Sequence, residues 1–599
     1  MIFRCCYAGS QLHNTSMTNP SPWQDFIPDP VLLHIFSFLE AKSLLRASCT
    51  CHRWYRIARD ESLWKILTQT NWDTKGGRKD SDQTWYQEYK RLFYHAPTQF
   101  SERIEGHSDE VLDVAFSHDG RLFCTTSKDT KVKIWEVGNP TQLKHTADLG
   151  LALDWNMTQY ATFNSNDTYL LVCGVKFQLP AAGSQSQGLG VVFRMKDFRL
   201  VQEMPMDPPH LFADWYNDNI CVGGYVPTAA NNDFFCVKAF KVIDDVPERI
   251  PLRCPYEEGS VIYSFFGDHH RTMNLLVANV PHKPEKSTVL RSQHKNSGQD
   301  TPQSSEIESD LLKTFSEDFH INPTIAPRDH TRDFLNSSKR DANANNSNIL
   351  HQANSKSKSS KDACDRCGKM SSAASALPSF DKYMIFVTGE QHNAIAFHRV
   401  EDLPETLEKK LKDKKLFEET VRKATEENGG QGNITATQLT TPVNPTKSIH
   451  LPGHYISGMK LSRDHRYLYF NCRYAIYDVE LGFPKLMEDM EVKTIDLQTF
   501  RLVPELVFGG HKGFSEFPAW YICLDSCDDY VASGSEQFLG YLWDRRYRTC
   551  LAKLQHCEGV VNGVAFNPVD PECLVTVADD RIINIWRARN RKKQLEEHT

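Results

Sequence analysis

Residues 106–136 read GHSDEVLDVAFSHDGRLFCTTSKDTKVKIWE, and this stretch indicates how most of the chain folds. A Gly-His pair opens it, two apolar-rich segments follow and a Trp closes it, which is typical of short strands separated by turns. The same order recurs from Gly510 to Asp544 and from Gln555 to Trp586. In each copy a Ser or Thr lies ten residues before the Trp. Self-similarity of this kind indicates a repeat architecture.

The repeat resembles the WD repeat, whose unit is a four-stranded blade of a β-propeller. The resemblance implies an all-β propeller of about seven blades over residues 98–280 and 381–590. Gln99–Ile104 precede the first Gly-His pair. We expect them to supply the outer strand of the last blade and to close the ring without an exposed edge.

In WD repeats a His, a Ser or Thr, an Asp and a Trp form a buried, hydrogen-bonded tetrad, and the resemblance implies the same structural role here. The first and last copies contain a complete set. In the middle copy Gln537 replaces the Asp, so a weaker tetrad is expected there. The tetrad residues are His107, Thr125, Asp129, Trp135, His511, Ser533, Trp543, His556, Thr576, Asp580 and Trp586.

Residues 25–70, which precede the propeller, have a helical pattern. From Leu32 to Leu39 apolar side chains recur at i, i+3, i+4 and i+7, which predicts an amphipathic helix. Further short helices follow, and residues 71–97 are expected to form a helical linker. A unit of this size is too small to bury its apolar surface alone, and we therefore expect a partner. The alternative is a self-contained helical bundle.

The helical segment resembles an F-box in its opening Pro28-Asp29, its Leu44-Leu45 pair and its Cys51-His-Arg-Trp54 run. The resemblance implies docking on the Skp-family adaptor of a cullin–RING (SCF) ubiquitin ligase. The residues expected to bind the adaptor are Pro28, Leu32, Leu33, Ile35, Phe36, Leu39, Leu44, Leu45, Trp54 and Trp64.

The remaining segments are polar. Residues 1–24 and 281–380 are predicted to be disordered, because the second segment is rich in Ser, Asn and Lys and neither can bury a core. Residues 401–445 form a second, charged insertion that is expected to contain a solvated helix. Residues 591–599 are expected to be a tail.

Composition excludes several functional classes. The 599 residues carry a formal net charge of −7, so a broad basic field for nucleic acid is not indicated. No apolar run of ~20 residues predicts a membrane helix, and the N-terminus does not resemble a secretory signal. The 17 Cys are therefore expected to be reduced thiols, which favours the cytoplasm, with the nucleus as the alternative.

We expect no catalytic residue, cofactor or metal. The sequence contains no phosphate-binding loop, HExxH, GxSxG or complete GxGxxG motif. A lone Cys364–Cys367 pair has no second pair at zinc spacing, which favours unpaired thiols over a metal site. Catalysis by this chain is therefore not expected.

Taken together, the F-box and the propeller make the chain similar to the F-box/WD-repeat family. The resemblance implies a substrate-recognition subunit of an SCF E3 ubiquitin ligase, in which the F-box binds the adaptor and the propeller binds the protein to be ubiquitinated for degradation. Such a subunit acts by proximity, because it raises the local concentration of substrate lysines near the conjugating enzyme.

Two alternatives remain open. Trp543-Asp544-Arg545-Arg546 has the WDxR form seen in receptors of cullin-4-type ligases, which bind a propeller adaptor. Asp544 and Arg546 are therefore possible contacts to that adaptor, although an ordinary surface Arg after a blade is an equally good interpretation. The other alternative is a propeller scaffold outside ubiquitin transfer.

The substrate is expected at the rim that carries the turns between the second and third strands of each blade. Lys128, Glu536 and Asp579 fall in such turns. One cation and two anions do not make the Arg cluster that would bind a phosphorylated degron, so a phosphodegron is not favoured. For any single one of the three, a solvated turn residue is the competing interpretation.

Overall fold

A computed structural model describes residues 27–74, 82–177, 186–206, 212–225, 234–244, 259–266, 272–281, 380–389, 392–428, 441–477, 484–514 and 521–597. The disorder predicted for residues 1–24 and for nearly all of 281–380 lies outside this range. Among the described helices, none is both long and apolar enough to cross a membrane.

The segment predicted to be helical is helical, and it starts where a Pro can begin a helix. It contains α1 (Asp29–Phe36), α2 (Ala41–Ser48), α3 (His52–Ala58) and α4 (Glu61–Trp72). The linker contains α5 (Trp85–Lys90) and a short π-helical turn, η2 (Arg91–His95). Thr84 and Gln87 form a capping box, so each satisfies a backbone N–H of the other at the start of α5.

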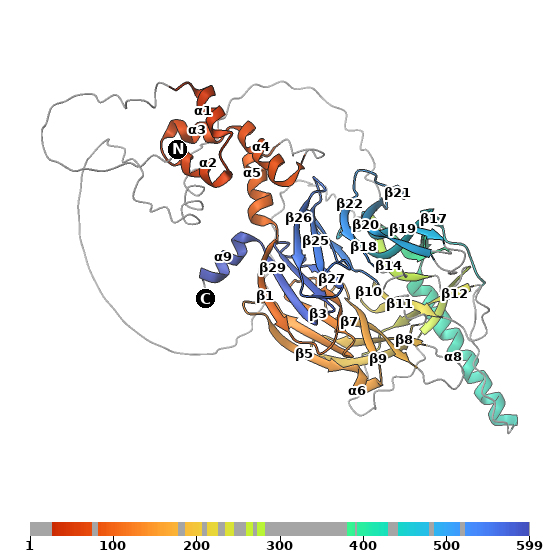
Figure 1. Cartoon of the computed structure of the whole chain (residues 1–599). Coiled ribbons are helices and arrows are strands. Elements are labelled where there is room, and N and C mark those ends of the chain that lie inside the picture. Colours follow the sequence, from red (N-terminus) through yellow and green to blue (C-terminus); the bar gives the residue numbers. More distant parts are fainter. Residues whose placement is uncertain are drawn as a thin grey trace, which may run out of the picture. The chain divides into compact units, whose positions relative to one another are not determined.

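The described strands form seven antiparallel sheets, which confirms the expected propeller (Figure 1). The first strand of each blade contacts the first strand of the next, so these strands are the innermost. The first three blades are β2 (Val111–Phe116), β3 (Leu122–Ser127), β4 (Lys131–Glu136) and β5 (Gln142–Asp148); β6 (Met157–Phe163), β7 (Tyr169–Phe177), β8 (Ser186–Arg194) and β9 (Arg199–Pro205); and β10 (Asp214–Asn217), β11 (Ile220–Tyr225), β12 (Phe234–Lys241) and β13 (Gly259–Phe266). A five-residue helix, α6 (Leu149–Leu153), joins the first blade to the second.

The later blades complete the ring. They are β14 (Met273–Pro281), β15 (Phe380–Thr388), β16 (Ala394–Val400) and β17 (Lys447–His450); β18 (His454–Leu461), β19 (Tyr467–Tyr477), β20 (Pro484–Asp496), β21 (Arg501–Leu502) and β22 (Phe508–Lys512); β23 (Leu524–Ser526), β24 (Tyr530–Ser533), β25 (Leu539–Asp544) and β26 (Cys550–Gln555); and β27 (Val561–Phe566), β28 (Cys573–Ala578) and β29 (Ile582–Arg587).

The last blade takes its outer strand from the start of the propeller. β1 (Gln99–Glu105) pairs antiparallel with β29, with Gln99 opposite Arg587 and Ile104 opposite Ile583. This is the closure that the sequence predicts. A final helix, α9 (Arg589–Glu597), follows β29 and includes residues 591–597 of the predicted tail.

The charged insertion is only partly solvated. It contains α8 (Leu403–Asn428), whose Leu403, Leu407 and Leu411 are buried in the core between the blades of β10–β13 and β14–β17. Lys410 Nζ donates to the carbonyl of Val261 at 2.7 Å. The expectation of a solvated helix is therefore wrong for the first part of α8, because a Leu at every fourth position gives that part an apolar stripe.

Two complete tetrads are present. His107 Nδ1 donates to Asp129 at 3.0 Å, its Nε2 bonds Thr125 Oγ1 at 2.8 Å, and Trp135 Nε1 donates to the same Oγ1 at 2.9 Å. A carboxylate can only accept, so the proton of the imidazole lies on Nδ1. The same contacts join His556 to Asp580 at 3.1 Å and to Thr576 at 2.7 Å, and Trp586 to Thr576 at 2.9 Å.

The tetrad predicted around His511, Ser533 and Trp543 is wrong. His511 lies on β22, which pairs with β20 of the preceding blade, and its Nε2 meets Asn471 Oδ1 at 3.1 Å. Ser533 Oγ accepts from Asn471 Nδ2 at 2.9 Å, and Trp543 Nε1 donates to the Gly509 carbonyl at 3.1 Å. Burial lowers the pKa of His511 to about 3, so this imidazole is neutral. Asn471 meets Nε2, the nitrogen that bonds Thr in the complete tetrads, and among the described residues nothing bonds Nδ1, where the absent Asp would have been.

Aspartates on innermost strands join neighbouring blades. Asp113 accepts from the backbone N–H of Ala161 at 3.1 Å, and Asp214 accepts from that of Val277 at 2.8 Å. Each donor lies on the innermost strand of the next blade. Burial raises the pKa of both carboxyls, that of Asp214 to about 6, because the charged form is poorly solvated.

His107→Ala should lower the free energy of unfolding by ~2–3 kcal/mol, because Asp129 and Thr125 lose a buried partner. Urea denaturation followed by fluorescence measures the change. His450→Ala, which removes an exposed imidazole, is the matched control and should stay within ~0.5 kcal/mol of the wild type. Equal urea midpoints for the two variants would contradict a structural role for the tetrad.

Asp214→Asn should flatten the pH dependence of stability between pH 3.8 and about 6. The folded protein holds the proton of Asp214 more tightly than the unfolded chain does, so the wild type loses stability as pH rises through this window. The Asn oxygen can still accept from Val277 but does not titrate. Urea midpoints at several pH values test this, and parallel curves for the two proteins would refute it.

Candidate functional site

The predicted adaptor-binding residues divide into two groups by burial. Leu32, Phe36, Leu44 and Trp64 form the interior of the helical segment, where Trp64 Nε1 donates to the Ala58 carbonyl at 2.8 Å. These four residues hold the helices together and cannot present their side chains to a partner. The residues that keep some exposed surface are Pro28, Leu33, Ile35, Leu39, Leu45 and Trp54.

The exposed apolar surface of α1 extends beyond the predicted set. Val31, Ile35 and Phe38 are 47%, 46% and 76% exposed. Val31 and Ile35 lie one turn apart on α1, and Phe38 lies in the turn that follows the helix; we call these three residues the α1 face. Sequence reasoning missed Val31 and Phe38. Three exposed large apolar side chains so close together are unusual in a protein surface without a partner.

An ion-pair cluster holds α1 to α3. Asp29 accepts from Arg53 at 2.8 Å and from Arg56 at 2.5 Å, and Arg53 also donates to the carbonyl of Ile27. The hydrogen bond from Arg53 lowers the pKa of Asp29, so the carboxylate stays charged near neutral pH. This cluster fixes the helix that carries the α1 face.

A buried charge network joins the linker to the sixth blade. Arg91 of η2 bonds Glu88 at 2.7 Å and Asp544, the last residue of β25, at 2.6 Å. Arg546 reaches the same Glu88 at 3.3 Å, and both carboxylates are fully buried. Burial lowers the pKa of Arg91, but the hydrogen bond to Glu88 and the charge of Asp544 outweigh it, so the guanidinium stays charged. We call Glu88, Arg91, Asp544 and Arg546 the linker network.

The linker network contains the two residues proposed as contacts for a cullin-4 adaptor. Asp544 is fully buried and Arg546 is ion-paired within the chain, so neither side chain projects freely from the blade. An adaptor could reach Asp544 only after Arg91 and the linker had moved. Their role as adaptor contacts stays a prediction.

Further contacts attach the linker on both sides. Tyr86 and Tyr89 of α5 pack edge-to-face on Trp64, with ring centroids 4.7 and 5.1 Å away. Arg589 of α9 lies over the ring of Phe93 at 4.3 Å. α5 contacts the helical segment, and η2 contacts α9, which follows the last blade. The linker therefore connects the helical segment to the propeller through packed side chains.

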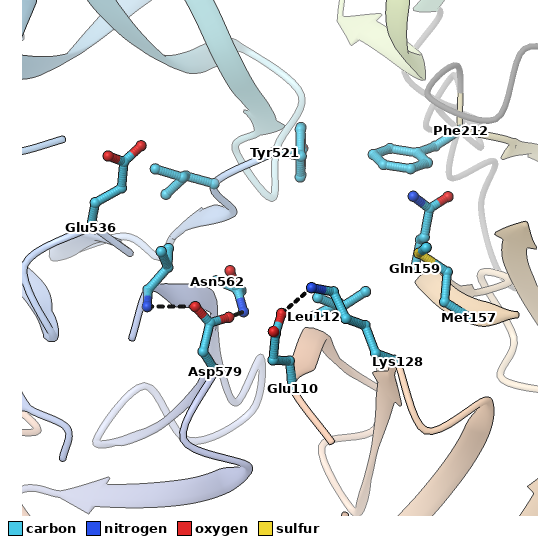
Figure 2. A pocket seen from close by; sticks show the side chains of 12 residues that line it. Glu110, Leu112, Lys128, Met157, Gln159, Phe212, Tyr521, Glu536, Asn562 and Asp579 are labelled. Carbon is cyan, nitrogen blue, oxygen red and sulfur yellow. Dashed lines mark hydrogen bonds and ion pairs between the residues drawn. The ribbon is translucent and has the colours of Figure 1, made fainter. Parts of the chain in front are cut away.

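The three predicted rim residues meet at one cavity. Lys128, Glu536 and Asp579 lie between the second and third strands of their blades, as expected, and all three line a cavity of about 230 Å³ (Figure 2). Glu110 lies beside Lys128 and forms an ion pair with it. The aromatic rings of Phe212 and Tyr521, which sequence reasoning missed, lie at another side of the cavity. Both residues lie just before innermost strands, Phe212 before β10 and Tyr521 before β23.

Comparison with known families accounts for both the helical segment and the propeller. The F-box-like family model matches residues 25–70, and the family model described as WD domain, G-beta repeat matches residues 98–136 and 548–587. The chain is 27% identical to F-box/WD repeat-containing protein 5 of Homo sapiens over 595 residues, which cover 95% of each chain.

The chain therefore combines an F-box-like segment with WD repeats, and it is similar over most of its length to F-box/WD-repeat proteins. It is also 27% identical to F-box/WD repeat-containing protein 5 of Mus musculus over 94% of this chain and 93% of the relative. F-box/WD repeat-containing protein 7 of Drosophila melanogaster is 26% identical over 22% of this chain and 12% of its own length. F-box/WD-repeat proteins are typically non-catalytic adaptors.

The described part of the chain contains no group of three or more His, Cys, Asp or Glu side chains arranged to hold a metal ion. Of its buried imidazoles, His107 and His556 are bound within the tetrads, and His511 contacts Asn471. The α1 face and the rim cavity are the two features whose binding we consider below.

Arg91→Met should lower the free energy of unfolding by ~3 kcal/mol, because Glu88 and Asp544 would remain buried without their cation. Arg121→Met is the matched control, since the Arg121 side chain is 81% exposed and water screens its ion pair with Asp119, so its loss should change the free energy of unfolding much less. Urea denaturation of the full chain measures both variants. Equal losses in the two would show that the linker network adds nothing beyond a surface ion pair.

Proposed function

We propose that this chain is the substrate-recognition subunit of an SCF-type E3 ubiquitin ligase. The observation that carries the proposal is the α1 face, an uncovered apolar surface on an F-box-like helical segment. The F-box implies a Skp-type adaptor as its partner, and burial of Val31, Ile35 and Phe38 against that adaptor would remove their apolar surface from water.

The propeller then holds the protein to be ubiquitinated. Its closed ring leaves the rim cavity open, and the linker network ties the F-box side of the chain to the sixth blade. A firmly attached linker keeps a bound substrate near the ligase, which raises the effective concentration of its lysines. The chain contributes binding and position, and the rest of the ligase supplies the chemistry.

Ile35→Asp and Phe38→Asp should each weaken binding of the Skp-type adaptor by about 30-fold or more, because a carboxylate would enter an apolar interface. The full chain is co-expressed with the adaptor, and the affinity is measured by titration of the purified proteins. Both side chains are exposed, so the fold should be kept. Leu32→Asp is unsuitable, since it places a charge in the interior.

Leu151→Asp is the matched control. Leu151 is 89% exposed on α6 of the propeller, so the same type of change should leave the affinity for the adaptor unaltered. Wild-type affinity in both α1 variants would contradict the proposal. A cullin-4-type ligase that co-purifies with the chain, and is lost in Arg546→Ala, would favour the alternative route.

A further inference from the structure

The rim cavity combines an apolar interior with a negative border. Leu112 and Val560 line it together with the rings of Phe212 and Tyr521, which meet edge-to-face with centroids 5.2 Å apart. Three carboxylates and one ammonium group face the same space (Figure 2). A volume of about 230 Å³ accepts a single long side chain but not a folded element.

The carboxylates are held in place by the protein. Asp579 accepts from the backbone N–H of Val560 at 2.8 Å and from Asn562 Nδ2 at 2.7 Å. Glu536 accepts from the backbone N–H of Phe514 at 2.5 Å and from the buried Arg473 at 3.4 Å. An ionised carboxyl group can accept up to four bonds, so Asp579 can accept from a further donor in the cavity.

The cavity also contains an acceptor that nothing satisfies. Gln159 lines the cavity, and within the described residues its buried Oε1 has no hydrogen-bond partner. A buried acceptor without a donor costs free energy, and a turn of the Gln159 side chain toward the cavity would let a ligand N–H satisfy it. Figure 2 shows the Gln159 amide between the aromatic pair and Lys128.

We propose that the rim cavity binds a basic side chain, an arginine or lysine, of the protein to be ubiquitinated. This inference rests on the proposed function, for which it specifies the substrate class. Such a side chain has an apolar stem that packs on Leu112 and the aromatic rings, and a cationic head that donates only. The head meets carboxylates from three blades and the faces of aromatic rings, both of which attract cations.

The same features exclude a phosphorylated residue. A phosphate would approach Glu110, Glu536 and Asp579 with only Lys128 as a lining cation, and Lys128 is ion-paired with Glu110. The negative charge of the phosphate would be repelled by these three carboxylates. Among the residues that line the cavity there is no group of arginines to bind it. A purely apolar side chain would gain nothing from the carboxylates, because it has no group that donates a hydrogen bond.

The test uses the full chain bound to its Skp-type adaptor. Bead-bound peptides carry one fixed central residue (Arg, Lys, Leu, Glu or phosphoserine) between randomised neighbours. The Arg and Lys pools should retain about tenfold more protein than the Glu and phosphoserine pools, because bonds between charged groups are the strong ones. Retention of the basic pools should fall as salt is raised.

Two opposite substitutions at the exposed edge of the cavity test the charge directly. Lys128→Glu should increase retention of the Arg and Lys pools, and Glu110→Lys should reduce it to the level of the Leu pool. Lys144→Glu, the same change on the outer strand of the same blade and outside the cavity, should have no effect. Both edge residues are partly exposed, so neither change should unfold the blade.

A preference for phosphoserine, equal retention of all pools, or Lys128→Glu and Glu110→Lys variants that both behave as wild type would each overturn the inference. These outcomes leave the proposed function intact as long as the adaptor stays bound. Loss of adaptor binding by the wild-type chain would instead count against the proposed function.

Discussion

The pairing of β1 with β29 is the contact on which the rest of this molecule depends. Without β1 the last blade would expose the edge of β29, and the ring would be open. β1 begins at Gln99, soon after η2 ends at His95, so the strand that closes the propeller also fixes the point where the linker leaves it. The position of Arg91 beside Asp544 follows from that closure.

Buried charges make the contact between the linker and the sixth blade specific. An ionised group inside a protein must be paired and hydrogen-bonded, and the loss of one partner exposes the full desolvation cost of the other. Glu88, Arg91 and Asp544 meet this condition only when the linker lies against the sixth blade. The charges of the WDxR motif therefore serve an internal contact, in which Arg546 also takes part.

The linker network and the rim cavity lie at opposite ends of their strands. Asp544 ends the third strand of its blade, whereas Glu536 precedes that strand. Successive strands of a blade alternate in direction, so the cavity forms at one rim and the linker attaches at the other. In the proposed ligase subunit this arrangement leaves the cavity accessible while the linker is bound.

The amino-acid sequence by itself determined the local elements. The spacing of Leu32, Ile35 and Phe36 specifies α1, and the recurring Gly-His, Thr and Trp positions specify blades and two of the tetrads, because such patterns depend on residues that are near neighbours in the chain. Only the tertiary structure decided which apolar residues at α1 stay exposed, that Asn471 joins His511 to Ser533, and that Leu403 and Leu407 attach α8 to the propeller. It also brought Glu110, Glu536 and Asp579 into one cavity and set Arg91 against Asp544. The residues in these last two contacts are hundreds of positions apart in the sequence. They meet only when the ring closes, and only then is it decided which side chains are buried and which charges are paired.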